Sequence, residues 1–239
     1  MQELRPAWLF RARSPVFVVF VVAFVALSAA IAAVGADAPD DSVNRYAKSI
    51  QGNAALDTVM IVITTTGDVG SLIIVAIILT IIRRTRKIGM ILLIAIVILA
   101  IAVMYMKPFI ARPLPPYKFE PALQLPENFG IESDSLAPFA KDLSFPSGHT
   151  ARVTAFAFII GFALYKRSKT ASYAIWAFPV IIGITRVYVQ QHYPTDLIGG
   201  FLIGMIISVV LCNAMKIWQP FQMSRFKGKE DKPPSEVQA

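Results

Sequence analysis

Two short groups of polar residues stand out in a chain that is otherwise largely hydrophobic. The first is the Ser-Gly-His stretch at residues 147–149, at the start of an apolar run. The second consists of Arg186, His192 and Asp196, which lie at the ends of two later apolar runs. The chain has only two histidines, and each group contains one of them. Ionisable residues beside apolar spans are functional candidates by default, so we expect these groups to form one site.

The stretch at residues 147–149 has the chemistry of an anion site. It follows Pro146 at the predicted start of a helix, where free backbone N–H groups and the helix dipole attract phosphate. Gly148 permits a phosphate to approach the backbone closely, and Ser147 adds a small hydroxyl. His149 can transfer a proton near neutral pH.

The second group adds a cation and a nucleophile. Arg186 offers a fork of donors that matches phosphate oxygens. His192 and Asp196 are four residues apart, and a carboxylate can hold one imidazole nitrogen and leave the other as a nucleophile. Together the two groups predict phosphoryl transfer to a histidine. In the alternative interpretation, both histidines are merely polar anchors at a membrane interface.

The composition indicates a membrane protein. Of the 239 residues, 56% are hydrophobic and only 16% are charged, whereas soluble domains have about 25% charged residues. The formal net charge is +8, but the basic residues form short clusters between apolar runs, which indicates membrane topology rather than nucleic-acid binding. The single cysteine, Cys212, excludes an intrachain disulfide and a cysteine-based metal site.

The apolar runs predict an all-α fold, an integral membrane bundle of six transmembrane helices. Each run is comparable with the roughly 20 residues that span a hydrocarbon core. A long Pro-rich segment, 107–145, is the expected extracytoplasmic loop between helices 3 and 4 and the expected substrate-selecting element. A cleaved signal peptide is an alternative for the first run, which is longer than the usual apolar core of such peptides. The expected spans are 15–36, 56–82, 88–106, 150–165, 172–189 and 196–215.

The basic clusters predict the orientation. With six spans, the clusters at 83–87 and 166–169 lie on the same side as both termini, and the positive-inside rule makes that side cytoplasmic. The candidate site then faces the extracytoplasmic side of the cell membrane. The expected organisation is a cytoplasmic segment at 1–14, a six-helix membrane domain at 15–216 and a disordered cytoplasmic tail at 217–239.

One further ionisable residue lies inside an expected span. Asp68 follows three threonines and a glycine within the second apolar run. Its carboxylate must face protein or water rather than lipid. We expect an interior polar group involved in helix packing, with a role at the site as the alternative.

These residues resemble the motifs of the type 2 phosphatidic acid phosphatase superfamily of integral-membrane lipid phosphatases, which is related to the vanadium haloperoxidases. The family motif Pro-Ser-Gly-His stands at residues 146–149. The motif Ser-Arg, followed by His and then Asp, is similar to Thr185-Arg186, His192 and Asp196, with threonine in place of serine.

The remaining family motif, lysine followed after six residues by Arg-Pro, is only partly present. Lys107 and Pro115 are in register, but Leu114 occupies the arginine position and Arg112 lies two residues earlier. Either Arg112 takes over the phosphate contact, or the site has one cation fewer. The segment that contains these residues is rich in proline, and its sequence alone fixes neither distance nor direction.

The resemblance implies specific roles. His192 is the expected nucleophile, Asp196 orients it, and His149 protonates the leaving group. The resemblance implies neither a metal nor a cofactor. The expected phosphate-binding residues are Lys107, Arg112, Ser147, Gly148 and Arg186.

The resemblance also implies a membrane lipid as substrate and the bilayer as the surroundings of the protein. A polyprenyl diphosphate is the favoured substrate, and phosphatidylglycerol phosphate and phosphatidic acid are the alternatives. Two other functions fit the same residues: a lipid phosphotransferase, and a non-catalytic membrane protein that binds an anion. The sequence leaves the oligomeric state open.

Overall fold

The computed structural model describes residues 6–34, 40–122 and 137–219. Within these residues the secondary structure is helical, with one isolated bridge between Pro113 and Leu143 and no strand. The all-α prediction is confirmed for this part of the chain. In order, the helices are α1 (Pro15–Val34), α2 (Asp41–Ser49), α3 (Ala54–Thr66), α4 (Val69–Ile81), α5 (Arg86–Ile110), the short 3-10 helix η1 (Pro138–Ala140), α6 (Gly148–Tyr165), α7 (Lys169–Ala174), α8 (Ala177–Tyr188) and α9 (Pro194–Ala214).

The described residues contain four or five candidate membrane spans. Four stretches are long and apolar enough to cross a bilayer: Pro15–Ala33, Arg86–Ile110, Lys169–Tyr188 and Pro194–Ala214. The pair α3 and α4 passes the same test together, although it is bent by 49° at its break. α6 is not among these candidate spans, and its first two turns carry the polar residues His149 and Arg152. The prediction of six spans therefore stays a prediction.

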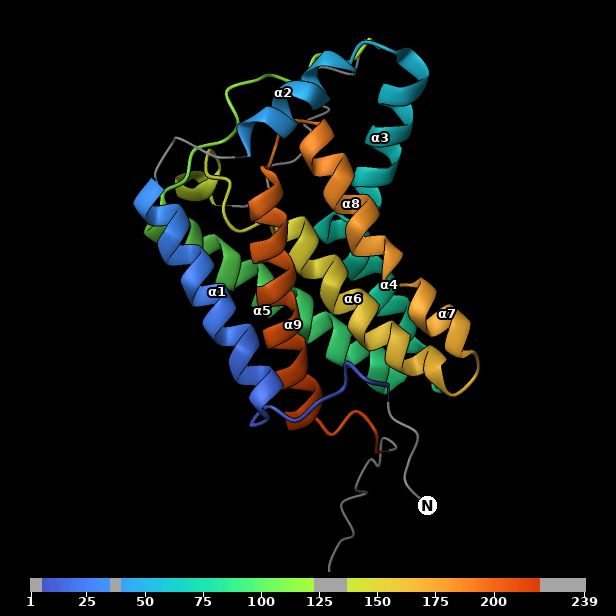
Figure 1. Ribbon diagram of the computed structural model, residues 1–239. Coiled ribbons are helices and arrows are strands. Elements are labelled where there is room, and N and C mark those ends of the chain that lie inside the picture. The colour runs from blue at the N-terminus through green and yellow to red at the C-terminus, as the bar shows by residue number, and fades with distance from the viewer. Residues whose placement is uncertain (1–5, 35–39, 123–136, 220–239) are drawn as a thin grey trace, which may run out of the picture.

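α6 is the central helix of the bundle (Figure 1). It packs against α9, α5, α8 and α7, and it also contacts α4. Twelve of its 18 residues are buried. Neighbouring helices rather than lipid therefore surround most of α6, which explains how its first two turns can carry polar side chains.

The expected span 56–82 is broken in its middle. α3 ends at Thr66, and α4 begins after Asp68, whose Oδ2 accepts a hydrogen bond from the Gly70 backbone N–H at 2.9 Å. A Cβ atom on Gly67 would lie 3.0 Å from Ile182 of α8 and 3.2 Å from Val153 of α6. The break thus brings the backbone close to two other helices, and Asp68 caps the second half. The expected span 56–82 is therefore built from two helices, and its crossing of the membrane stays a prediction.

Other boundaries also differ from the sequence-based expectation. The short helix α2 lies between the expected spans 15–36 and 56–82. The expected span 172–189 consists of α7 and α8, and α5 continues past Lys107 to Ile110. Residues 123–136 of the expected loop at 107–145 lie outside the described residues, as do residues 220–239 of the expected tail.

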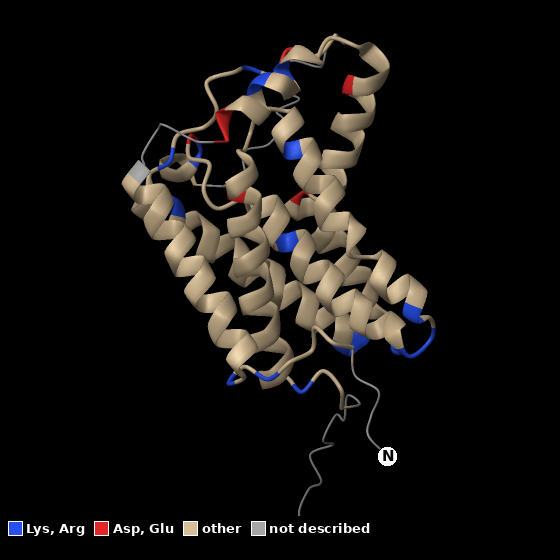
Figure 2. Cartoon of the chain, viewed as in Figure 1, with Lys and Arg blue, Asp and Glu red and all other residues tan. Residues whose placement is uncertain are grey.

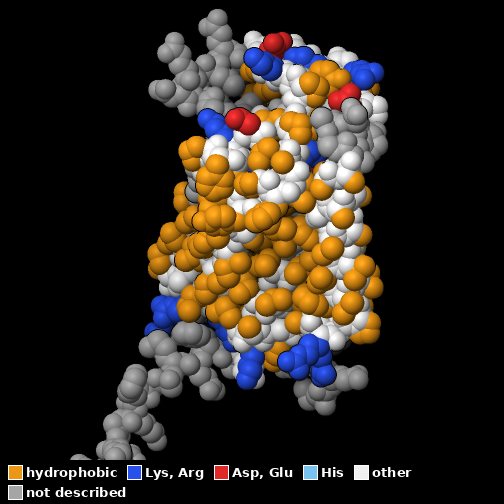
Figure 3. Space-filling view, turned by 90° about the vertical axis from the view of Figure 1, so that its left-hand side faces the viewer, with side chains coloured by type: hydrophobic (Ala, Val, Ile, Leu, Met, Phe, Trp, Pro, Cys, Tyr) orange, Lys and Arg blue, Asp and Glu red, His pale blue; other side chains and the backbone are white. Residues whose placement is uncertain are grey.

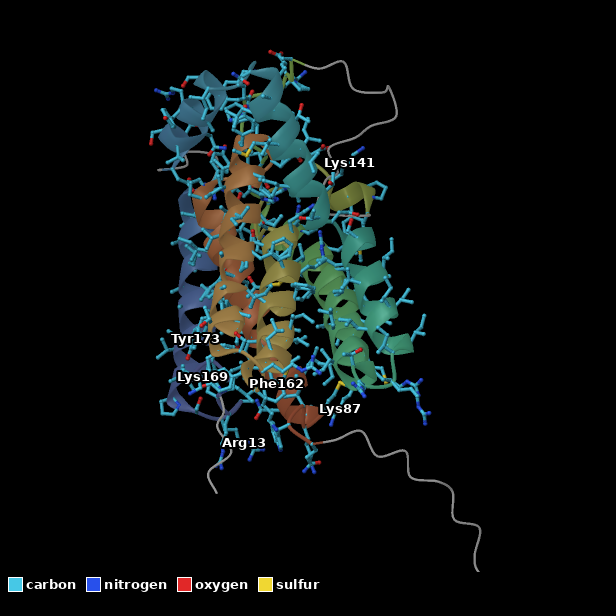
Figure 4. All side chains as sticks on the ribbon, turned by 90° about the vertical axis from the view of Figure 1, so that its right-hand side faces the viewer. Arg13, Lys87, Lys141, Phe162, Lys169 and Tyr173 are labelled. Carbon is cyan, nitrogen blue, oxygen red and sulfur yellow. The ribbon has the colours of Figure 1, made fainter. Side chains whose placement is uncertain are left out.

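Charge is distributed unequally between the two ends of the bundle. Lys and Arg gather at one end, whereas Asp and Glu lie toward the other end, where some basic residues also occur (Figure 2). A broad hydrophobic surface separates the ends (Figure 3). Arg13, Lys87 and Lys169 lie at the basic end, and Lys141 lies toward the opposite end (Figure 4). An apolar band with one basic end is the pattern of a multi-pass membrane protein.

The first turns of α6 and α9 approach each other through a glycine. A Cβ atom on Gly200 would overlap the Ser147 carbonyl oxygen and would lie 3.0 Å from the Thr150 Cβ. Small residues allow this close approach between membrane helices. The contact holds the Ser-Gly-His stretch next to the start of α9, where the second polar group begins.

We predict that Gly200→Ala destabilises the protein. The added methyl group meets backbone rather than a movable side chain, and overpacking of this kind costs about 1–3 kcal/mol. The matched control is Gly183→Ala, whose Cβ would meet only the end of the Leu197 side chain, at 3.1 Å from Cδ1. Thermal unfolding in detergent should give a lower midpoint for Gly200→Ala than for Gly183→Ala. Equal midpoints would show that the helices separate readily.

Candidate active site

The N-terminus of α6 is held against the start of α9. Ser147 is the N-cap residue, and its Oγ accepts hydrogen bonds from the Thr150 backbone N–H at 3.4 Å and from the Thr150 hydroxyl at 3.2 Å. The Ser147 backbone N–H donates to the Asp196 carbonyl oxygen at 3.0 Å. Ser147 and Gly148 are both buried. This helix terminus has the position and the backbone donors of an anion site.

His192 is fixed through both its ring and its backbone. Oδ2 of the fully buried Asp196 lies 3.5 Å from His192 Nδ1 and accepts a hydrogen bond from the Tyr193 backbone N–H at 2.8 Å. The His192 carbonyl oxygen accepts a hydrogen bond from Asn44 of α2 at 2.9 Å. A histidine with a carboxylate facing Nδ1 can present Nε2 as a nucleophile.

Arg112 connects the segment after α5 with the start of α9. Its Nη1 donates to Asp196 Oδ1 and to Thr195 Oγ1, both at 2.6 Å, and its Nη2 donates to Asp40 Oδ1 at 2.8 Å. The guanidinium carbon also lies 4.0 Å from the centre of the Tyr193 ring. These described contacts favour a role in positioning Asp196. The phosphate-binding role expected for Arg112 stays a prediction.

Asp40 completes this connection from the segment before α2. Its Oδ2 accepts hydrogen bonds from the Thr195 backbone N–H at 2.8 Å and from the Thr195 hydroxyl at 2.7 Å. Burial by itself raises the pKa of the Asp40 carboxyl, but the Thr195 hydrogen bonds and the Arg112 charge outweigh it and lower the pKa below the ordinary value of 3.8. Asp40 is therefore ionised at neutral pH. We call Asp40, Arg112, Thr195 and Asp196 the Arg112 clamp.

Two more cations expected from the sequence are buried near the helix ends. Lys107, in the last turn of α5, donates from Nζ to the Leu143 carbonyl oxygen at 2.6 Å and is 1% exposed. Arg186, near the end of α8, reaches Thr64 Oγ1 of α3 at 3.5 Å and is also 1% exposed. Buried cations inside an apolar bundle mark binding sites more often than packing sites.

The structure therefore brings most of the expected residues into one region. The contacts of Asp196 with Ser147 and Arg112 join the ends of α5, α6 and α9. Lys107 approaches the same region through Leu143, just before the Ser-Gly-His stretch. The described contact of Arg186 is different, because it joins α8 to α3.

Sequence reasoning missed several residues of this region. The first is Arg152, which is 2% exposed and whose Nη2 lies 3.3 Å from His149 Nδ1. A lone charge inside the apolar run 150–165 was a signal that could have found it. Asn44 and Asp40 gave no such signal, because both lie in a polar segment where such residues are ordinary.

Comparisons with known proteins agree with these features. Residues 88–220 match the family model described as the PAP2 superfamily. Undecaprenyl-diphosphatase BcrC of Bacillus subtilis is 31% identical over 87 residues, which is 36% of this chain and 43% of that relative. An undecaprenyl-diphosphatase of Sulfolobus acidocaldarius is 30% identical over 159 residues, which is 65% of this chain and 68% of that relative. The match to BcrC thus spans less than half of its length.

Solved structures share the fold. The crystal structure of a transmembrane PAP2 type phosphatidylglycerolphosphate phosphatase from Bacillus subtilis has a TM-score of 0.66 and 23% sequence identity, covering 86% of this chain and 98% of that one. The crystal structure of Aquifex aeolicus LpxE has a TM-score of 0.54 and 23% sequence identity, covering 73% of this chain and 94% of that one. The predicted relationship to phosphatases is confirmed: the family model matches more than half of the chain, and this protein belongs to the PAP2 superfamily.

Proposed function

We propose that this protein is a lipid phosphatase that hydrolyses a polyprenyl diphosphate through a phosphohistidine intermediate. The observation that carries the proposal is the buried pair of His192 and Asp196, bonded through Asp196 to the N-terminus of α6. Binding of an anion needs cations and backbone donors, but it does not need a histidine oriented by a carboxylate. The pair therefore favours catalysis over non-catalytic anion binding.

The proposed reaction has two steps. Nε2 of His192 attacks the terminal phosphorus, the bond to the bridging oxygen breaks, and the lipid monophosphate leaves with the electron pair. Water then cleaves the bond between phosphorus and nitrogen and releases orthophosphate. Asp196 keeps Nε2 available for attack in the first step, because its carboxylate faces Nδ1.

The remaining site residues stabilise the negative charge that develops during transfer of the phosphoryl group. The Ser147 hydroxyl, the Gly148 backbone N–H and the side chains of Lys107 and Arg186 are the proposed ligands of the phosphoryl oxygens. His149 is the proposed donor to the leaving oxygen. These groups lie within the protein, where electrostatic interactions are stronger than in water.

A lipid substrate is favoured by both location and relatives. The side of the bundle seen in Figure 3 is broadly hydrophobic between its ends. A lipid tail can therefore stay in the bilayer while its phosphate reaches the site at the starts of α6 and α9. Two relatives are named undecaprenyl-diphosphatases, which supports a polyprenyl diphosphate as the substrate of this chain. Other relatives are named lipid A 1-phosphatase and phosphatidylglycerophosphatase B, and phosphatidic acid is a further alternative from the family resemblance.

The proposed orientation places the site outside the cytoplasm. The basic end of the bundle, with Arg13, Lys87 and Lys169 (Figure 4), lies away from the starts of α6 and α9, which carry the candidate site (Figure 1). Basic residues favour the cytoplasmic side. We propose six spans, with α6 as one of them and both termini in the cytoplasm. The domain boundaries at 15 and 216 belong to the same proposal.

The first test is phosphate release by detergent-purified protein in the presence of EDTA. Wild type should release phosphate from a short-chain polyprenyl diphosphate faster than from phosphatidic acid. His192→Gln should lose at least about 10⁴-fold in kcat, as expected for loss of a nucleophile, while keeping the unfolding temperature of the wild type. A labelled phosphoryl group should appear on wild-type protein only, in an acid-labile form.

The other possible outcomes each contradict part of this proposal. Release that persists in His192→Gln contradicts the phosphohistidine step. Transfer of phosphate to an added lipid alcohol, instead of to water, identifies a phosphotransferase. No release from either lipid by folded wild-type protein would make non-catalytic anion binding the better explanation.

A second prediction concerns the Arg112 clamp. Arg112→Gln leaves the buried Asp196 carboxylate without its guanidinium, a loss that costs about 3–5 kcal/mol of folding free energy. Because Arg112 acts through Asp196, kcat should fall while KM changes little. A rise in KM at unchanged kcat would instead support phosphate binding by Arg112. The control is Arg45→Gln, which removes an exposed arginine of α2 and should change neither constant.

The clamp also predicts a pH dependence of stability. Because folding lowers the pKa of Asp40, ionised Asp40 stabilises the folded state above the unfolded value of 3.8, and this contribution is lost as pH falls through the lower folded value. Asp40→Asn should lower the unfolding temperature at pH 7, and the difference from wild type should shrink below about pH 4. Asp41→Asn, at a neighbouring surface pair with Arg45, is the control. If the difference in unfolding temperature between wild type and Asp40→Asn does not change with pH, the lowered pKa of Asp40 is contradicted.

A further inference from the structure

Arg152 is a buried charge that the proposed reaction does not yet use. It lies on α6 one turn after His149 and is 2% exposed. Most of the side chains that follow it on α6 are apolar. Its Nη2 lies 3.3 Å from His149 Nδ1. A permanent charge is costly to bury among apolar helices, so its presence on α6 points to a function.

The chemistry of this contact favours one state of the His149 ring. A guanidinium is always protonated and can only donate hydrogen bonds. A lone pair on the ring nitrogen that faces it would accept this hydrogen bond, which favours a single ring proton on Nε2 of His149.

The two histidines are thus distinguished by opposite partners. Asp196 faces Nδ1 of His192, which favours a proton on that nitrogen and a free lone pair on Nε2. Arg152 faces Nδ1 of His149, which favours the reverse arrangement. One ring is prepared to attack phosphorus, and the other is prepared to donate a hydrogen bond through Nε2–H.

We propose that Arg152 is a positioning residue that holds His149 as a neutral Nε2–H donor, and that this state makes the site selective for lipid diphosphates over lipid phosphate monoesters. The inference rests on the proposed phosphohistidine reaction and names the class of substrate that the site takes. It concerns His149 and its partner, whereas the proposed reaction depends on His192.

The selectivity follows from the two leaving groups. When the bond to the bridging oxygen of a diphosphate breaks, the electron pair remains on a phosphate oxygen, whose conjugate acid has a pKa of about 6. This group leaves without a proton, and a hydrogen bond from Nε2–H is sufficient. A monoester releases an alkoxide, whose conjugate acid has a pKa comparable with the value of about 15.7 for bulk water. An alkoxide needs a full proton, which a neutral imidazole supplies poorly.

The kinetic test compares the two substrate classes in matched variants. Arg152→Met removes the donors and the charge while keeping a long side chain, and Arg152→Lys keeps a charge and a donor. Thr154→Val is the control, because Thr154 is a buried polar residue on the same helix and is not one of the proposed site residues. For each protein, kcat and KM are measured with farnesyl diphosphate and with a short-chain phosphatidic acid.

We expect Arg152→Met to lower kcat for the diphosphate by about 10- to 100-fold, by analogy with losing a group that orients a ligating histidine. Turnover of the monoester should fall less than that of the diphosphate, or should rise. The ratio of kcat/KM for the diphosphate to kcat/KM for the monoester should therefore drop. Arg152→Lys should restore part of this ratio, and Thr154→Val should leave it unchanged. Equal losses on both substrates would indicate a purely structural role and would overturn the proposal.

A second measurement reads the ring state directly. Because the chain contains only two histidines, ¹⁵N-histidine labelling of protein without an affinity tag gives two imidazole spectra, and His192→Gln assigns them. His149 should show an unprotonated Nδ1 and a protonated Nε2 in wild type, and Arg152→Met should change this pattern. A protonated Nδ1 in wild-type His149 would refute the inference.

The two proposals fail in different ways. If wild type hydrolyses neither lipid, or if turnover survives in His192→Gln, the phosphohistidine reaction is wrong. If turnover depends on His192 but the substrate ratio and the His149 spectrum do not respond to Arg152, only the present inference is wrong.

Discussion

The buried carboxylate of Asp196 is the interaction on which the rest of the site depends. One oxygen faces His192 and caps the start of α9, and the other accepts a hydrogen bond from Arg112. The backbone carbonyl of the same residue binds the N-terminus of α6 through Ser147. A single residue therefore ties the ends of three helices together, and its burial makes each of these contacts stronger than the same contact in water.

The fold provides the surroundings that such a group needs. A buried carboxylate is stable only when it is paired and hydrogen-bonded. Arg112 supplies the charge, and the packing of α6 among its neighbours keeps lipid away from the polar residues. The polar site and the apolar bundle thus depend on each other, because neither the charges nor the central helix is suited to contact lipid directly.

The sequence predicted the helical class, the family and the residue types of the site, because apolar runs and motif spacing are local signals. The break at Gly67 and Asp68 was not predictable from periodicity, since both halves of the pair are equally apolar and the bend depends on contact with Ile182 and Val153. The partners of Arg112 were equally hidden. Two of these partners, Asp40 and Asp196, are far from Arg112 in the sequence. Arg112 itself lies in a Pro-rich segment, whose sequence does not reveal which residues it approaches.

The close contact between Gly200 and the Ser147 backbone limits which parts of this protein can change. Two helices that touch through backbone atoms have no room to slide, so the spacing between the two halves of the reaction centre cannot be adjusted in small steps. Under the proposed function, a different head group would have to be accommodated away from this contact. The contact therefore constrains the geometry of the proposed reaction more tightly than it constrains the choice of substrate.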